Sequence, residues 1–181
     1  RHVCGTLGIP HYVIDYRELF RTMVMEPFAQ SYMKGETPNP CVQCNDHVKF
    51  VPLLQHARAL GAEALVTGHY ARIEKRDGHW SLLTGLDGQK DQSYFLFGLD
   101  KEALPFVRFP LGELSKEEVR ELARRYRLPN WDKSDSEDIC FVPDGNYAKV
   151  IEGLVSPESV PGEGEIVDAR GEALGTHQGI H

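Results

Sequence analysis

Apolar side chains recur at helical spacing along two long parts of the chain. The first part covers residues 17–34, contains Pro27 and is followed by Gly35. A proline inside a helix kinks or divides it, and a left-handed glycine commonly ends one, so we predict a helix interrupted at Pro27 and closed by Gly35. The second part covers residues 50–60, and we expect Pro52 in the first turn of that helix, where a missing N–H is tolerated.

A third helix is predicted over residues 115–126. Ser115–Glu118 has the sequence of a capping box, and the apolar side chains behind it keep the helical period. Arg120, Arg124 and Arg127 share another face of this helix. An arginine stripe of this kind usually faces solvent, and a contact with phosphate groups is the alternative.

Shorter apolar runs predict strands between these helices. Residues 11–16 are rich in β-branched and aromatic side chains, and residues 64–67 form an apolar run that leads into Gly68 and His69. Two alternating runs within residues 71–86 predict a hairpin. The order helix, short loop and buried strand predicts a parallel α/β layer, in which ligands bind beyond the carboxyl ends of the strands. Gly68 and His69 are expected at that position.

The pattern changes near the end of the chain. From residue 157 onward, glycine and proline separate short β-rich runs, unlike the preceding alternation of helix and strand. We therefore predict one domain over residues 1–156 and the beginning of a small β-rich domain over residues 157–181.

Composition narrows the class of protein. The 181 residues are 41% apolar and 26% charged, which is ordinary for a globular domain. No apolar run is long enough to span a membrane and no signal peptide is recognisable, so a cytoplasmic location is expected. The formal net charge of -7 argues against a protein that coats nucleic acid by charge alone, although a local basic face remains compatible with it.

The four cysteines are the strongest chemical signal in the chain. Their uneven spacing is unlike a secreted disulfide framework. Cys41 and Cys44 follow Pro38 and Pro40, which predict a stiff loop rather than a helix. A Cys-x-x-Cys pair suits a redox pair, half of a metal site, or two small buried side chains, and the pair alone leaves these alternatives open. Cys140 lies in a short strand-like apolar run, where a packed core residue is the usual interpretation.

Five ordered motifs together strongly resemble the bacterial tRNA-specific 2-thiouridylase family. The resemblance covers nearly the whole chain. The motifs are Thr37-Pro38-Asn39-Pro40-Cys41-Val42-Gln43-Cys44-Asn45, Thr67-Gly68-His69-Tyr70-Ala71-Arg72, Lys90-Asp91-Gln92-Ser93-Tyr94-Phe95-Leu96, Phe109-Pro110-Leu111-Gly112 and Asp135-Ser136-Glu137-Asp138-Ile139-Cys140-Phe141-Val142-Pro143.

The resemblance implies a fold and an activity. Residues 1–156 would be the C-terminal part of a pyrophosphatase-loop adenylation and thiolation domain, a Rossmann-like fold of the adenine nucleotide alpha hydrolase type. Residues 157–181 would begin the family's small central β domain. The implied reaction is the 2-thiolation of the wobble uridine of tRNA, with ATP and Mg²⁺ as cofactors. The sulfur would come from a sulfur-relay protein or a cysteine desulfurase.

The resemblance also implies roles for individual residues. Cys44 would be the nucleophile and Cys140 the carrier of a persulfide, and the two would end the reaction as a disulfide. The remaining positions are Gly68 for ATP, Asn39, Pro40 and Cys41 for the target base, and His69, Lys90, Asp91 and Gln92 for tRNA.

The chain departs from the family pattern at two points. The family's Ser-Gly-Gly-x-Asp-Ser loop, which grips ATP, is absent, and so is its C-terminal β-barrel. We therefore expect a middle part of a longer enzyme that is inactive alone. In addition, Cys41 stands where many members have aspartate. Related sulfur transferases hold a [4Fe-4S] cluster on such a trio, so Cys41, Cys44 and Cys140 are alternative cluster ligands.

A rival hypothesis from another class is a non-enzymatic RNA-binding module with a structural zinc site. Its ligands would be three cysteines and a histidine such as His47 or His69. Stoichiometric zinc without iron or ATP dependence would favour it. Such a site gives no reason for the motifs at Gly68 and Lys90, so we rank it lower.

Overall fold

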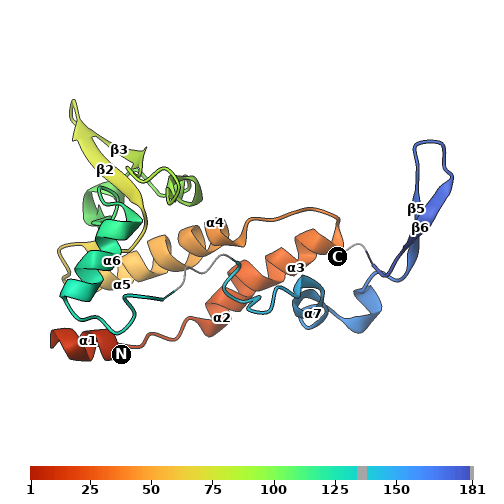
Figure 1. The fold of residues 1–181 in the computed structure, drawn as a ribbon, viewed down its shortest axis with the longest axis horizontal. Coiled ribbons are helices and arrows are strands. Elements are labelled where there is room, and N and C mark those ends of the chain that lie inside the picture. The colour runs from red at the N-terminus through yellow and green to blue at the C-terminus, as the bar shows by residue number, and fades with distance from the viewer. Residues whose placement is uncertain (134–137, 180–181) are drawn as a thin grey trace. The chain divides into compact units, whose positions relative to one another are not determined.

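The computed structural model describes residues 1–133 and 138–179 (Figure 1). The chain divides into two compact units. Unit 1 comprises Arg1–Tyr16 and Cys44–Asp135, and unit 2 comprises Arg17–Gln43 and Ser136–His181. Each unit has its own cluster of buried apolar side chains.

A parallel strand pair lies in the core of unit 1. Strand β1 (Leu65–Val66) pairs with β4 (Val107–Arg108), with Leu65 opposite Val107. This confirms the predicted parallel α/β layer. The strand at residues 64–67 is less buried than expected, because Val66 is 59% exposed. The core around the pair comprises Phe50, Leu54, Ala71, Leu96, Leu99, Ala103, Leu104, Val107 and Phe109.

An antiparallel hairpin follows β1, as the sequence predicts. Strands β2 (Ala71–Arg76) and β3 (His79–Thr84) pair along their whole length (Figure 1). Asp77 and Gly78 both have positive φ, at 49° and 83°, as a two-residue type I′ turn requires. A side chain on Gly112 would overlap the carbonyl of Ala71, so the loop after β4 approaches the start of β2 very closely.

The helix that carries the cysteine pair begins earlier than predicted. α4 (Pro40–Cys44), the π-helical η2 (Asn45–Leu53) and α5 (Leu54–Ala59) follow one another without a break. The predictions of a loop at the two cysteines and of a helix start at Pro52 are therefore wrong. Asn39 Oδ1 accepts a hydrogen bond of 3.4 Å from the Val42 N–H, so Asn39 caps the helix and Pro40 begins it.

Other parts of unit 1 agree with the sequence in some places and differ in others. Helix α6 (Lys116–Arg125) has the predicted capping box. Residues 11–16 form no strand, and the side chains of Tyr12 and Val13 are 81% and 84% exposed. A strand needs a hydrogen-bonding neighbour, and among the described residues none pairs with this segment. The remaining elements of unit 1 are α1 (His2–Leu7), η3 (Ser93–Leu96) and η4 (Leu104–Phe106).

Unit 2 is built around a helix with a π-helical segment in its middle. α2 (Arg17–Phe20), η1 (Arg21–Met25) and α3 (Glu26–Met33) are consecutive, and Pro27 lies in the first turn of α3. Gly35 has φ 73° and donates to the Tyr32 carbonyl at 2.8 Å, which confirms the predicted left-handed end, whereas the backbone stays helical from η1 into α3 and is not divided at Pro27. α3 packs against α7 (Tyr147–Glu152) through Phe28, Ala29 and Ile151.

The end of the chain forms a second antiparallel hairpin. η5 (Pro157–Ser159) precedes β5 (Gly164–Val167), which pairs with β6 (Ala173–His177) with a register irregularity at Ile166 and Val167 (Figure 1). The boundary at residue 157 stays a prediction. Over the described ranges 1–133 and 138–179, no helix is both long enough and apolar enough to cross a membrane.

Candidate active site

The predicted nucleophile and base-binding residues lie on and before α4. Asn39 caps this helix, Pro40 is its first residue and is buried, Cys41 is exposed and Cys44 is half-buried. Cys41 belongs to unit 2 and Cys44 to unit 1. The predicted chemical roles of these residues stay predictions.

Directly after Cys44 comes Asn45, a buried polar residue that the sequence analysis missed. Its side chain is only 2% exposed. The amide Nδ2 donates to the Phe95 carbonyl at 2.8 Å, and Oδ1 accepts from Lys49 Nζ at 3.0 Å. Both ends of the buried amide are therefore satisfied, as burial requires. A signal was present in the sequence, because an asparagine and a lysine four residues apart face each other on a helix.

His69 lies beyond the carboxyl end of β1, as predicted. Its Nδ1 is 2.7 Å from Thr67 Oγ1, and its ring packs at centroid distances of 5.9 Å from Phe50 and 5.8 Å from Phe109. Burial, and secondly the nearby Lys49 ammonium, lower the pKa of His69 to about 4. His69 is therefore a neutral imidazole near pH 7, and it has no charge with which to attract a phosphate.

Gly68, the predicted ATP contact, is exposed next to His69. A side chain built there would meet only the Leu111 Cδ1 atom, at an ordinary contact distance of 3.7 Å. Packing within the protein therefore does not require glycine at this position. The exposed backbone at the end of β1 is open to a ligand.

Asp91, a predicted tRNA contact, accepts several hydrogen bonds from its own unit. Oδ1 accepts from the N–H of Gly85 at 2.7 Å and of Ser93 at 3.3 Å, and Oδ2 accepts from Ser93 Oγ at 2.7 Å. Burial alone would raise the pKa of Asp91, but the hydrogen bonds from Gly85, Ser93 and Gln92 lower it below its ordinary value. Asp91 is thus an ionised carboxylate that organises its own loop.

Gln92 fastens the same loop to the start of β2. Its Oε1 accepts from the Tyr70 N–H at 3.0 Å, and its own N–H donates to the Tyr70 carbonyl at 2.8 Å. A side chain on Gly85 would come within 2.9 Å of that carbonyl oxygen, so glycine is required there. Lys90 is half-buried in the turn before Asp91, and its N–H donates to the Asp87 carbonyl at 3.0 Å. The predicted tRNA contacts of these residues stay predictions.

Asp46, beside Asn45, is a further carboxyl group that the sequence analysis did not single out. Its Oδ1 is buried without a hydrogen-bond partner among the described residues, and a side chain on Gly98 would overlap this carboxyl group. Burial raises the pKa of Asp46, and the neighbouring His47 partly offsets that effect.

Cys140, the predicted persulfide carrier, is exposed on a turn in unit 2. The Val142 N–H donates to the Ile139 carbonyl at 2.9 Å across this turn, so the predicted strand around Cys140 is wrong. The interpretation of Cys140 as a packed core residue is also wrong, because its neighbours carry the packing instead. Val142 is fully buried, and the Phe141 ring lies 5.1 Å from that of Phe28.

Two contacts fix the ends of this turn. Tyr147 Oη donates to Asp138 Oδ1, and this hydrogen bond raises the pKa of Tyr147 to about 12. Phe141 also contacts the Phe20 ring at a centroid distance of 5.7 Å. The first part of the motif, residues 135–137, lies outside the described residues.

No metal centre is evident in the part of the chain that the structure describes. Within residues 1–133 and 138–179, no three or more His, Cys, Asp or Glu side chains are grouped as metal ligands. The zinc alternative included His47, which is exposed, and His69, whose Nδ1 contacts Thr67. The cluster alternative on Cys41, Cys44 and Cys140 stays a prediction.

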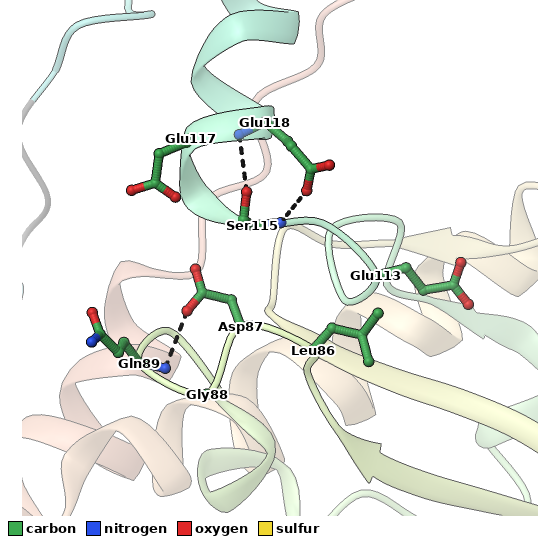
Figure 2. A pocket seen from close by; sticks show the side chains of 8 residues that line it. All are labelled: Leu86, Asp87, Gly88, Gln89, Glu113, Ser115, Glu117 and Glu118. Atoms are coloured by element: carbon green, nitrogen blue, oxygen red, sulfur yellow. Dashed lines mark hydrogen bonds between the residues drawn. The ribbon is translucent and has the colours of Figure 1, made fainter.

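A depression at the start of α6 is lined by none of the predicted site residues, although Gln89 directly precedes Lys90 in the chain (Figure 2). Ser115 and Glu118 exchange the two capping-box hydrogen bonds there, and Asp87 accepts from the Gln89 N–H at 3.1 Å. Carboxylates dominate its wall, which disfavours phosphate groups. The lining residues are Leu86, Asp87, Gly88, Gln89, Glu113, Ser115, Glu117 and Glu118.

Known proteins are similar to this chain along nearly all of its length. Residues 1–144 match the family model described as the tRNA methyl transferase HUP domain. Curated proteins named tRNA-specific 2-thiouridylase MnmA are 55% identical in Methylorubrum populi, 53% in Rickettsia conorii and 52% in a Bradyrhizobium species. The matches cover 99%, 98% and 99% of this chain and 46%, 48% and 45% of those proteins, respectively.

The chain thus spans about half the length of the curated relatives it matches. The matched family model confirms the predicted Rossmann-like α/β class, and the parallel pairing of β1 with β4 agrees with that class. The resemblance of the five motifs is confirmed as well. The chain belongs to the tRNA methyl transferase HUP domain family, which includes the bacterial tRNA-specific 2-thiouridylases.

Proposed function

We propose that this chain is part of an enzyme that transfers sulfur to carbon 2 of a uridine in tRNA. The observation that carries the proposal is the identity of 52% to 55%, over 99% of this chain, with proteins named for that activity. The wobble position of the uridine is the finer expectation from the motif resemblance. No second function has a comparable observation in its favour.

ATP is the cofactor that the proposal requires, and the residues at the end of β1 suit it. Gly68 offers an exposed backbone, and Lys49 supplies an ammonium group close to His69. In the described residues the hydrogen-bond partner of this ammonium is a neutral amide rather than a carboxylate, so its positive charge is available to a phosphate group. Bound ATP would supply the activation that turns a uridine oxygen into a leaving group.

Cys140 is proposed to deliver the sulfur. Its exposure on a turn suits a thiol that must receive a sulfur atom from a donor protein, such as a sulfur-relay protein or a cysteine desulfurase. The terminal sulfur of its persulfide attacks carbon 2 of the activated uridine, and the carbon–oxygen bond to the leaving group breaks. The tRNA is then joined to Cys140 through a disulfide.

Cys44 is proposed to release the product. Its thiolate attacks Sγ of Cys140, the sulfur–sulfur bond to the tRNA breaks, and the electron pair leaves with the 2-thiouridine sulfur. Cys44 and Cys140 are then joined as a disulfide, which an external thiol must reduce before the next cycle. Half-burial of Cys44 and the hydrogen-bonded Asn45 beside it favour a thiol held in one orientation.

The tRNA-facing residues are proposed to act in two ways. Asn39, Pro40 and Cys41, at the start of α4, would border the target base. His69, neutral near pH 7, would contact tRNA by stacking or hydrogen bonding rather than by charge. Asp91 and Gln92 are already hydrogen-bonded within unit 1, so they would act mainly by shaping the loop that presents Lys90.

The proposal is tested with the full-length protein, unmodified tRNA, a persulfide donor and ATP with Mg²⁺. Mass spectrometry of the digested nucleosides should show 2-thiouridine that depends on both ATP and the donor. Omission of ATP is the matched control. Absence of 2-thiouridine under these conditions, with the protein folded and able to bind tRNA, would refute the proposed activity.

A further inference from the structure

The contact between Asn45 and Lys49 has a consequence beyond local packing. Asn45 is almost wholly buried, and its amide is held at one end by the Phe95 carbonyl. The other end accepts one hydrogen bond from the Lys49 ammonium, at 3.0 Å. An ammonium group has three donors, so this contact directs Lys49 without exhausting it.

The charge of Lys49 is not neutralised by its described surroundings. Lys49 is half-buried, and the polar partner that the structure records for it is the neutral Asn45 amide. The neighbouring carboxyl group of Asp46 points instead towards Gly98, where its Oδ1 has no hydrogen-bond partner among the described residues. A partly buried cation without a carboxylate favours an anion, because the electrostatic attraction is weakly screened there.

The position of Lys49 indicates which anion. Phe50, the next residue, packs against the His69 ring, and the Lys49 ammonium is close enough to that ring to lower the pKa of His69. His69 and the exposed Gly68 follow strand β1 directly. In open parallel α/β sheets, ligands bind beyond the carboxyl ends of the strands, and Lys49 is next to this end of β1.

We propose that Lys49 binds the phosphate group of the nucleotide beyond β1, and that Asn45 is the residue that positions its ammonium. This inference rests on the ATP requirement of the proposed function and deepens it by naming the residues that bind phosphate. Asn45 touches no substrate in this scheme. It links the cation to the Phe95 carbonyl, and thereby to the loop that carries Lys90, Asp91 and Gln92.

Binding of AMP to the full-length protein, measured by calorimetry, tests the role of Lys49. Lys49→Met should weaken AMP binding by about tenfold or more, because one charge-assisted hydrogen bond is lost. Lys49→Arg keeps the charge and should bind AMP more tightly than Lys49→Met. The matched control is Lys101→Met, which removes the same charge from an exposed turn of unit 1 and should change binding less than about twofold.

A second measurement uses the unchanged protein and does not depend on whether any variant folds. The titration of the His69 ring is followed by NMR in the presence of AMP or of adenosine, which lacks the phosphate. AMP should raise the pKa of His69, because the phosphate offsets the charge of Lys49, and adenosine should not. Equal effects of AMP and adenosine, or AMP binding unaffected by Lys49→Met, would overturn the inference.

The role of Asn45 is separated from simple packing by Asn45→Asp. The new carboxylate would pair with Lys49 and neutralise it, so AMP binding should weaken by several-fold even though Lys49 is present. Unchanged AMP binding in folded Asn45→Asp would exclude a positioning role.

These experiments distinguish a failure of the Lys49 inference from a failure of the proposed sulfur transfer. Lys49-dependent AMP binding without any 2-thiouridine formation would sustain the phosphate contact and refute the sulfur transfer. If sulfur transfer is observed and AMP binding is unaffected by Lys49→Met, the proposed activity is supported and this inference is refuted.

Discussion

The two candidate sulfur-handling cysteines are held in opposite ways. Cys44 is half-buried and precedes Asn45, whose amide is hydrogen-bonded at both ends within unit 1. Cys140 is exposed, and its neighbour Phe141 anchors the turn through apolar packing on Phe28 within unit 2, while Val142 is fully buried. The residue that follows one thiol is thus held by directional hydrogen bonds, and the residue that follows the other is held by apolar packing.

The difference matches the two chemical tasks that we propose. Hydrogen bonds are directional, so a polar network suits a nucleophile that must attack along one line. Apolar packing fixes the base of a turn while leaving its tip open, which suits a thiol that meets a donor protein and a tRNA in succession.

The largest effect is expected from removing either thiol. Cys44→Ser and Cys140→Ser in the full-length protein should each reduce 2-thiouridine formation by about a thousandfold or more, since a hydroxyl cannot carry sulfane sulfur or form the disulfide. Binding of tRNA, measured by filter retention, should remain close to that of the parent. Cys4→Ser, in the short helix α1, is the control and should be nearly silent. Substantial activity in Cys140→Ser would show that another residue carries the sulfur.

The next largest effect is expected at Phe28, the core residue on which Phe141 anchors the Cys140 turn. Phe28 is fully buried and its ring contacts those of Tyr32, Phe141 and Tyr147. Phe28→Ala should lower the free energy of unfolding by about 3–5 kcal/mol, as large-to-small substitutions in a core do. Denaturant unfolding measures this change. Phe97→Ala, at an exposed ring, should cost less than about 1 kcal/mol. Similar costs at both positions would contradict the proposed anchor.

A smaller effect concerns pH and the polar region. The pKa of His69 is about 4 in the folded chain, below the ordinary 6.5, so the unfolded chain binds the proton more readily. Stability should therefore rise with pH between about 4 and 6.5, and the loss at acid pH should reach at most about 3.4 kcal/mol. In His69→Gln this part of the slope should flatten, whereas the exposed His47→Gln should retain it. Unfolding curves recorded across this pH range measure the slope. An unchanged slope in His69→Gln would contradict the buried neutral imidazole.

The smallest effect is expected at Cys41, which tests whether the chain uses a persulfide or a cluster. In the persulfide route, Cys41→Asp should change 2-thiouridine formation by only a few-fold, because aspartate is common at this position in the resembling family. Anaerobic reconstitution with iron and sulfide, followed by metal counting and absorption spectroscopy, provides the comparison. Activity that requires a [4Fe-4S] cluster and disappears in Cys41→Asp would replace the persulfide route by cluster chemistry.

Local chemistry alone was sufficient to predict several elements. The Asp77–Gly78 turn, the Ser115–Glu118 capping box and the left-handed Gly35 each depend on contacts between residues close in sequence. The start of α4 is also local, since Asn39 caps the helix and Pro40 begins it. The conformational preference before each proline favours a loop there, but the cap at Asn39 prevails over it.

Tertiary structure decided the features that depend on distant partners. Residues 11–16 have strand-like composition, yet a strand forms only where another strand supplies hydrogen bonds. Cys140 lies in an apolar run, yet it is Phe141 that packs against the core of unit 2 and Val142 that is fully buried, and the thiol is left exposed. The family can be recognised from the sequence alone, through motifs whose order can be read directly. The fold alone brings distant partners together, such as the Asn45 amide and the Phe95 carbonyl, which are fifty positions apart in the chain. Local preferences do not distinguish between such partners. Burial selects among them, because a buried polar group needs a hydrogen bond.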